Sequence, residues 1–131
     1  MKYGASILAL TLASTFAFAQ GENKTLTAIP ESVTVTDYYK QNVYDPADNK
    51  IGSIEDVLVD PAGKITAFIV GVGGFLGVGE KDVATPFTAI KGQQKDGKWY
   101  LTMSANKDEL KSAPGFKYDR TQTRWVPETT K

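Results

Sequence analysis

The sequence of 131 residues contains no histidine and no cysteine. Without imidazole or thiol groups, the chain cannot form a Ser-His or Cys-His nucleophile, a histidine or thiolate metal site, a haem ligand of either type, or a disulfide. We therefore expect a protein that is not an enzyme and that uses no cofactor and no metal ion.

The sequence also lacks an excess of either charge, because 15 Lys and Arg residues balance 15 Asp and Glu residues. A neutral surface has no general attraction for nucleic acid or for anionic lipid, so neither is expected as a partner. Five carboxylates lie near one another in the sequence: Asp45, Asp48, Glu55, Asp56 and Asp60. A calcium loop starting at Asp45 would need an oxygen ligand at position 47 and glycine at position 50, and the sequence has alanine and lysine there.

A long apolar segment occurs near the N-terminus, over residues 7–18. It is shorter than the roughly 20 residues of a membrane-spanning helix. Lys2 precedes it, and Ala17-Phe18-Ala19 follows with the small-x-small pattern of a signal-peptidase site. The pattern predicts a signal peptide over residues 1–19, cleavage after Ala19, a periplasmic or secreted product, and no membrane span after cleavage. The alternative is an uncleaved N-terminal anchor.

The mature chain of about 112 residues is the size of one domain. We expect a flexible leader over residues 20–35, a folded domain over residues 36–113 and a polar tail over residues 114–131. Trp125 is isolated in that tail, and we expect it to pack back onto the domain because burial of one aromatic ring needs no second protein.

Short β-branched and aromatic segments between turn residues predict a mainly β domain. Strands are expected over residues 43–44, 51–60, 65–72, 82–86 and 99–103, with residues 87–90 extending the pairing. Turns are expected over residues 61–64 and over residues 93–98, which contain Asp96-Gly97. Thr36 or Asp37 can cap a helical turn over residues 36–40, and Asn106 can cap a helix over residues 107–113. This set of elements predicts a small antiparallel barrel with one short C-terminal helix.

Two of the expected strands are apolar on both faces. They contain Val57-Leu58-Val59 and Phe68-Ile69-Val70, whereas simple alternation would bury every second residue. Such strands are covered on both sides, or they form a barrel wall that contacts a partner.

The segment Gly71–Gly79 contains five glycines. It fails as a phosphate-binding loop, because Glu80 stands where that motif requires lysine. Positive φ angles at a barrel corner would explain the glycines, and an exposed apolar tip would make the segment a contact site. The candidate interaction loop comprises Gly73, Gly74, Phe75, Leu76, Gly77, Val78 and Gly79.

The remaining candidates give weak signals. Trp99 and Tyr100 are adjacent on an expected strand, so one ring should point inward and the other outward. Ser104 and Lys107, or a pair of carboxylates, could serve a hydrolase, but no spacing supports this reading.

Two segments of the chain resemble the PRC-barrel family, which takes its name from the cytoplasmic domain of the photosynthetic reaction-centre H chain. They run from Tyr44 to Asp60 and from Gly63 to Phe87, and the second contains Gly73-Gly74-Phe75-Leu76-Gly77 followed by Pro86-Phe87. The resemblance covers residues 37–113. It implies a small, strongly bent β-barrel that docks onto proteins, as in a ribosome-maturation factor, and it brings no shared catalytic residues. Thr85 departs from the family pattern, which commonly has an aliphatic residue there.

Three functions follow from these observations. The first is a non-catalytic periplasmic module that binds an unidentified protein or a second copy of itself. The alternative is a module that binds a small apolar ligand or lipid at the barrel mouth near Phe75 and Leu76. A carboxylate or Ser/Lys hydrolase is the third and has the least support.

Overall fold

The computed structural model describes residues 24–73 and 79–129. The chain divides into two units, Met1–Ser32 and Val33–Lys131. The described part of the first unit, residues 24–32, is exposed and forms no helix or strand. The predicted signal peptide lies outside the described residues. Within the described ranges, no helix has the length and apolar character needed to cross a membrane.

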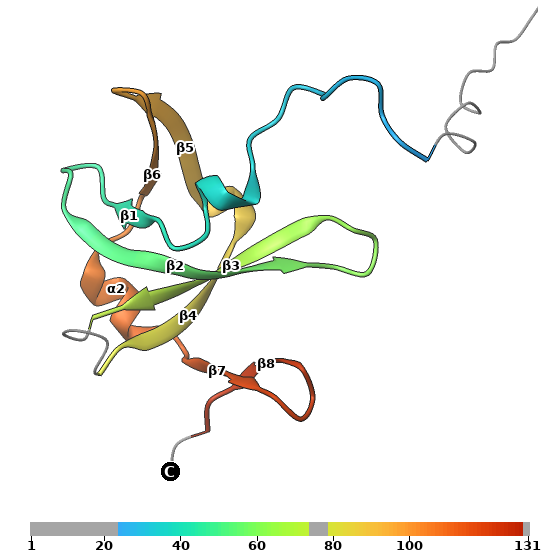
Figure 1. Cartoon of the computed structure of the whole chain (residues 1–131). Coiled ribbons are helices and arrows are strands. Elements are labelled where there is room, and N and C mark those ends of the chain that lie inside the picture. The colour runs from blue at the N-terminus through green and yellow to red at the C-terminus, as the bar shows by residue number, and fades with distance from the viewer. Residues whose placement is uncertain (1–23, 74–78, 130–131) are drawn as a thin grey trace, which may run out of the picture. The chain divides into compact units, whose positions relative to one another are not determined.

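The second unit is built around a six-stranded sheet (Figure 1). Its strands are β1 (Asn42–Tyr44), β2 (Lys50–Val59), β3 (Ile65–Val72), β4 (Lys81–Pro86), β5 (Ile90–Lys95) and β6 (Lys98–Met103). The spatial order is β4-β3-β2-β1-β6-β5. The β1–β6 pair is parallel, and the other neighbours are antiparallel.

The predicted mainly β class is confirmed, but closure of the sheet into a barrel is not. Among the described residues, β4 and β5 are the two edges of the sheet and do not pair with each other. Pro86 ends β4, and the chain then turns through the 3-10 helix η2 (Phe87–Ala89). Proline has no N–H to donate to a further ladder, so it suits the end of an edge strand. The bent barrel of the family stays a prediction for the whole chain.

Apolar side chains from both halves of the sheet meet on its inner face. The fully buried members of this core are Val43, Ile51, Ile54, Phe68, Val70, Val72, Val83 and Leu101. Tyr38 stacks on Phe68 with ring centroids 5.1 Å apart, and Phe87 packs against both rings. Tyr38 follows the 3-10 helix η1 (Val35–Asp37), so this short helix holds an aromatic ring over the inner face.

The face of β3 that points away from the core is also buried, which explains why this strand is apolar on both sides. Ile69 is 1% exposed but does not belong to the inner core, and it pairs across the sheet with Asp56 of β2. The Trp125 Nε1–H donates a hydrogen bond of 2.8 Å to Asp56 Oδ2. The second face is therefore covered in part by the chain's own C-terminal segment, and the apolar β3 pattern does not by itself require a partner.

That segment forms a second sheet of two strands, β7 (Phe116–Asp119) and β8 (Arg124–Pro127), and β7 contacts β4. The expected return of Trp125 to the domain is confirmed by its bond to Asp56, and within the hairpin its ring also contacts Tyr118 edge-to-face. The sequence pattern describes residues 114–131 only as a polar tail and gives no signal for the hairpin.

One α-helix, α2 (Lys107–Ser112), follows β6. The Asn106 side chain accepts a hydrogen bond from Glu109 N, and the Glu109 side chain accepts one from Asn106 N. This reciprocal pair is a capping box, which satisfies two amide groups at the start of the helix.

Three local predictions are wrong. Thr34, and not Thr36 or Asp37, caps the first helical turn, because Thr34 and Asp37 form a capping box. Residues 87–89 form η2 in place of strand pairing. The expected turn over residues 93–98 is shorter, because β5 continues to Lys95.

Candidate functional site

The predicted interaction loop connects β3 to β4. Gly73 and Gly79 stand at its two ends, each with φ near +78°. Only glycine adopts this conformation at little cost, so the two glycines are needed where the chain leaves and rejoins the sheet. The other residues of the candidate loop, Gly74, Phe75, Leu76, Gly77 and Val78, lie outside the described residues.

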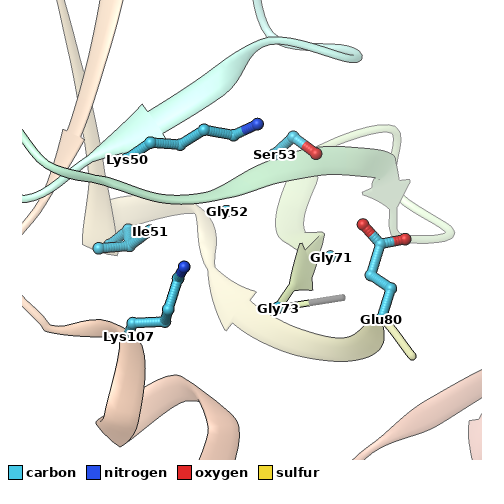
Figure 2. A pocket seen from close by; sticks show the side chains of 8 residues that line it. All are labelled: Lys50, Ile51, Gly52, Ser53, Gly71, Gly73, Glu80 and Lys107. Atoms are coloured by element: carbon cyan, nitrogen blue, oxygen red, sulfur yellow. The ribbon is translucent and has the colours of Figure 1, made fainter. Parts of the chain in front are cut away.

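A cavity of about 190 Å³ lies at the base of this loop (Figure 2). Its lining comprises Lys50, Ile51, Gly52, Ser53, Gly71, Gly73, Glu80 and Lys107. In Figure 2, Glu80 lies near Gly71, Lys107 points toward Ile51, and the Lys50 side chain extends toward Ser53. An apolar ligand here would have to desolvate charged side chains, which is unfavourable. The described part of the site thus gives no support to the apolar-ligand hypothesis.

Two carboxylates converge on Gly71 beside this cavity. A Cβ atom at position 71 would lie 2.5 Å from Glu80 Oε2 and 3.0 Å from Glu55 Oε2. The absence of a side chain at Gly71 therefore provides the space that the two carboxylates occupy. Lys40 forms an ion pair of 3.0 Å with Glu55 and partly compensates this negative charge.

A third carboxylate, Asp82, pairs across the sheet with Gly71. Burial is the main cause of an Asp82 pKa raised to about 6, and the negative charges of Glu80, Glu55 and Glu128 also contribute to this rise. Its Oδ1 atom is buried and has no hydrogen-bond partner among the described residues. Asp82 is therefore an acid that takes up a proton in mildly acidic solution.

The carboxylates considered for calcium are not brought together as a cation site. Asp45 Oδ1 accepts hydrogen bonds from Ala47 N and Asn49 N, and Asp60 Oδ1 accepts the equivalent bonds in the next turn. The bond from the Asn49 amide is the main cause of a lowered Asp45 pKa. Over residues 24–73 and 79–129, no group of three or more acidic side chains is placed to hold a metal ion. Of the two residues Ser104 and Lys107, Lys107 lines the cavity and Ser104 does not.

The adjacent aromatic residues of β6 point to opposite faces, as expected. Trp99 packs edge-on against Tyr38 of the core, with ring centroids 6.4 Å apart. Tyr100 stacks on Tyr44 at 5.0 Å on the other face, and Lys95 Nζ lies 4.1 Å from the centroid of the Tyr100 ring. With Tyr44 and Lys95 against it, the Tyr100 ring is already engaged within the chain.

The hydroxyl of Tyr100 donates a hydrogen bond to the Asp48 carboxylate. This bond is the main reason why the Tyr100 pKa is raised to about 12. The bond fixes the loop between β1 and β2 against β6, so Asp48 has a structural partner in place of a metal ion.

The sheet edge formed by β5 is the feature that sequence reasoning missed. Within the part of the chain that the structure describes, β5 pairs with β6 on one side and with no strand on the other. The polar residues Gln93 and Gln94 led to the prediction of a turn here, because glutamine has no strong preference for sheets. Asp96-Gly97 was a usable signal, because a two-residue turn of this kind pairs the residues before it with the residues after it.

Taken together, the architecture defines a small, mainly β module with an open sheet. The PRC-barrel domain model matches residues 30–110, and the chain belongs to this family. The match includes the six-stranded sheet and most of α2, and it ends before the β7–β8 hairpin. No curated protein matches the sequence.

Proposed function

We propose that this protein is an exported, non-catalytic module that binds another protein or a second copy of itself. The single observation that carries the proposal is the β5 edge, which has a neighbouring strand on one side only in the described structure. An unpaired edge presents a row of backbone N–H and C=O groups and acts as a template for strand addition.

Two further observations support this function. Family membership favours it, because the PRC-barrel resemblance implies docking onto proteins. The N-terminal sequence supports export, because residues 1–19 combine a basic start, a short apolar segment and an Ala-x-Ala site. We accordingly place the mature protein in the periplasm or the medium.

The proposal can be tested by photo-crosslinking in the compartment where the mature protein resides. A photoreactive amino acid at the exposed position Gln94 of β5 should yield a crosslinked species of higher mass. The same amino acid at Ala62, in the exposed β2–β3 turn, is the matched control and should yield much less. Light scattering on purified residues 20–131 then shows whether the bound molecule is a second copy.

The result against the proposal is equally clear. A strictly monomeric protein that gives no crosslink at position 94, or equal crosslinking at positions 94 and 62, would remove the basis for a binding edge.

A further inference from the structure

We propose that the β5 edge binds an extended, acidic segment of a partner protein, which adds to the sheet as a further strand. This inference rests on the proposed function, and it specifies the chemistry of the partner and the mode of binding. It follows from the hydrogen-bond register of the β5–β6 hairpin, from the charge of its exposed side chains and from the space beside it.

The register determines which backbone groups of β5 are free. Asp96 and Gly97 have φ values of +53° and +78°, as in a two-residue type I′ turn, and Lys95 pairs with Lys98 on either side of them. Lys95 and Lys98 therefore form a hydrogen-bonded pair, and such pairs alternate with non-hydrogen-bonded ones along the hairpin. Gly92 and Gln94 occupy the non-hydrogen-bonded positions, opposite Leu101 and Trp99.

The N–H and C=O groups of Gly92 and Gln94 consequently point away from β6, toward the open edge. None of these groups has another backbone partner within the described ranges. At the start of the strand the Ile90 N–H is already bonded to the Phe87 carbonyl. The free part of the edge thus begins at Gly92, and it contains no proline that would block a further ladder.

The exposed side chains of this hairpin favour a negatively charged partner. Lys91, Lys95 and Lys98 are all exposed, and Asp96 is the one acidic residue in the sequence from Phe87 to Ala105. Asp37, which belongs to a capping box, and Asp48, which accepts a bond from Tyr100, are charged residues of neighbouring elements and not of the hairpin. The hairpin itself therefore presents three positive charges and one negative charge.

A second copy of the chain fits this edge less well. Lys91 and Lys95 lie on the same face of β5, because their side chains are four residues apart on a strand. Antiparallel pairing of two β5 strands about a twofold axis would keep the lysines of both copies on one face, where like charges repel. Carboxylates of an acidic segment would instead meet these lysines with opposite charge.

The inner side of the edge has room for the side chains of an added strand. A cavity of about 430 Å³ is lined there by Asp37, Gln41, Gln94, Gly97, Lys98 and Trp99. An added strand would direct alternate side chains into this cavity and toward the lysines on the opposite face. The geometry therefore favours a segment with acidic residues at every second position.

The test uses two synthetic octapeptides, one with alternating Glu and Val and one with alternating Lys and Val. Each is titrated into isotope-labelled residues 20–131 while backbone amide signals are followed by NMR. We expect the Glu–Val peptide to bind at least about tenfold more tightly than the Lys–Val peptide. The amides of Gly92 and Gln94 should become protected from hydrogen exchange on binding, whereas the amide of Ala62 should not change.

Two variants separate the backbone contribution from the charge contribution. Gln94→Pro removes an outward N–H without removing a β5–β6 hydrogen bond, and it should weaken binding of the Glu–Val peptide by about tenfold. Lys91→Glu should reduce or reverse the preference between the peptides. Lys117→Glu makes the same charge change on the exposed part of β7 and should have little effect.

Equal affinity for the two peptides, absence of binding at about 1 mM, or signal changes centred away from β5 would each overturn the inference. Crosslinking at position 94 distinguishes a failure of this inference, that the bound segment is acidic, from a failure of the proposed function, that the β5 edge binds a protein. If the crosslink forms but the Glu–Val peptide does not bind, the edge binds a partner of other chemistry, and only this inference fails. If neither result is obtained, the proposed function fails as well.

Discussion

The contact between Gly92 and Trp99 provides a quantitative test of the packing. A Cβ atom at position 92 would lie 2.5 Å from both Cε2 and Nε1 of the Trp99 ring. Carbon atoms pack at about 3.5–4.0 Å, so the substitution Gly92→Ala must displace the indole or the strand. The indole cannot move freely because it also packs against Tyr38 in the core. Overpacking of this kind lowers the free energy of unfolding by about 1–3 kcal/mol.

Urea denaturation of residues 20–131 is the appropriate assay. The urea concentration at the unfolding midpoint should be lower in Gly92→Ala than in the original protein. The slope of the unfolding free energy against urea concentration should stay the same, because the substitution lowers stability without changing the surface that unfolding exposes. Gly97→Ala is the matched control, because nothing lies within 4 Å of its Cβ position and the cost comes from its φ of +78° alone.

A double-mutant cycle identifies Trp99 as the cause. Trp99→Phe replaces the indole by a smaller ring, so the loss in the Gly92→Ala/Trp99→Phe variant should be at least about 1 kcal/mol smaller than the sum of the two single losses. Additive losses, or a loss below about 0.5 kcal/mol in Gly92→Ala itself, would refute the packing argument.

Three further predictions concern Asp82, Thr85 and Trp125. The pKa of Asp82 is raised from 3.8 to about 6 in the folded state, so the folded protein binds the proton more tightly and stability falls as the pH rises from about 4 to about 6. Asp82→Asn should therefore stabilise the protein by about 1 kcal/mol at pH 7, after discounting for solvent exposure, and give no gain near pH 4. The exposed Glu31→Gln serves as control, and a gain that does not depend on pH would contradict this account. Thr85 is 4% exposed, and its hydroxyl has no hydrogen-bond partner in the described structure. Thr85→Val should raise the free energy of unfolding by about 1–2 kcal/mol in a urea titration, whereas a loss of stability would show that the hydroxyl is satisfied. Trp125→Ala removes the ring that bonds to the sheet, so trypsin should cleave the β7–β8 hairpin several times faster, and an unchanged cleavage rate would show that the ring does not hold the hairpin in place.

The parts of the fold that the sequence predicted depend on short-range signals. The turn between β2 and β3 is fixed by Asp60 and Gly63, which have the side chain and the backbone freedom that a tight turn requires. The β-branched and aromatic residues on either side then form the two longest strands of the sheet. The start of α2 is equally local, because Asn106 and Glu109 cap each other within four residues.

The parts that the sequence did not predict depend on contacts between distant residues. Lys117 and Arg124 make the C-terminal hairpin polar, and its docking follows from a bond between Trp125 and Asp56, which are 69 residues apart. The β5 strand was predicted as part of a turn because Gln93 and Gln94 have weak preferences, and pairing with β6 outweighs them.

The candidate site shows the same division. The glycines around the β3–β4 loop were evident from the sequence, and Gly73 and Gly79 do adopt the positive φ angles that favour glycine. Their neighbour Gly71 has a role that no local pattern reveals, since it makes room for Glu55 and Glu80. Whether Phe75 and Leu76 form a contact site stays a prediction, because they lie outside the described residues.

The sequence by itself determined the mainly β class and excluded histidine and thiol chemistry, because composition and turn residues act locally and need no knowledge of the fold. The family followed from the resemblance of two segments to the PRC-barrel domain. Only the tertiary structure decided which strands form the edges of the sheet and which carboxylate takes up a proton near pH 6. The strand order and the crowding of negative charge around Asp82 arise from the pairing of segments far apart in the chain, whereas the free hydrogen-bonding groups of β5 follow from its register with the adjacent strand β6.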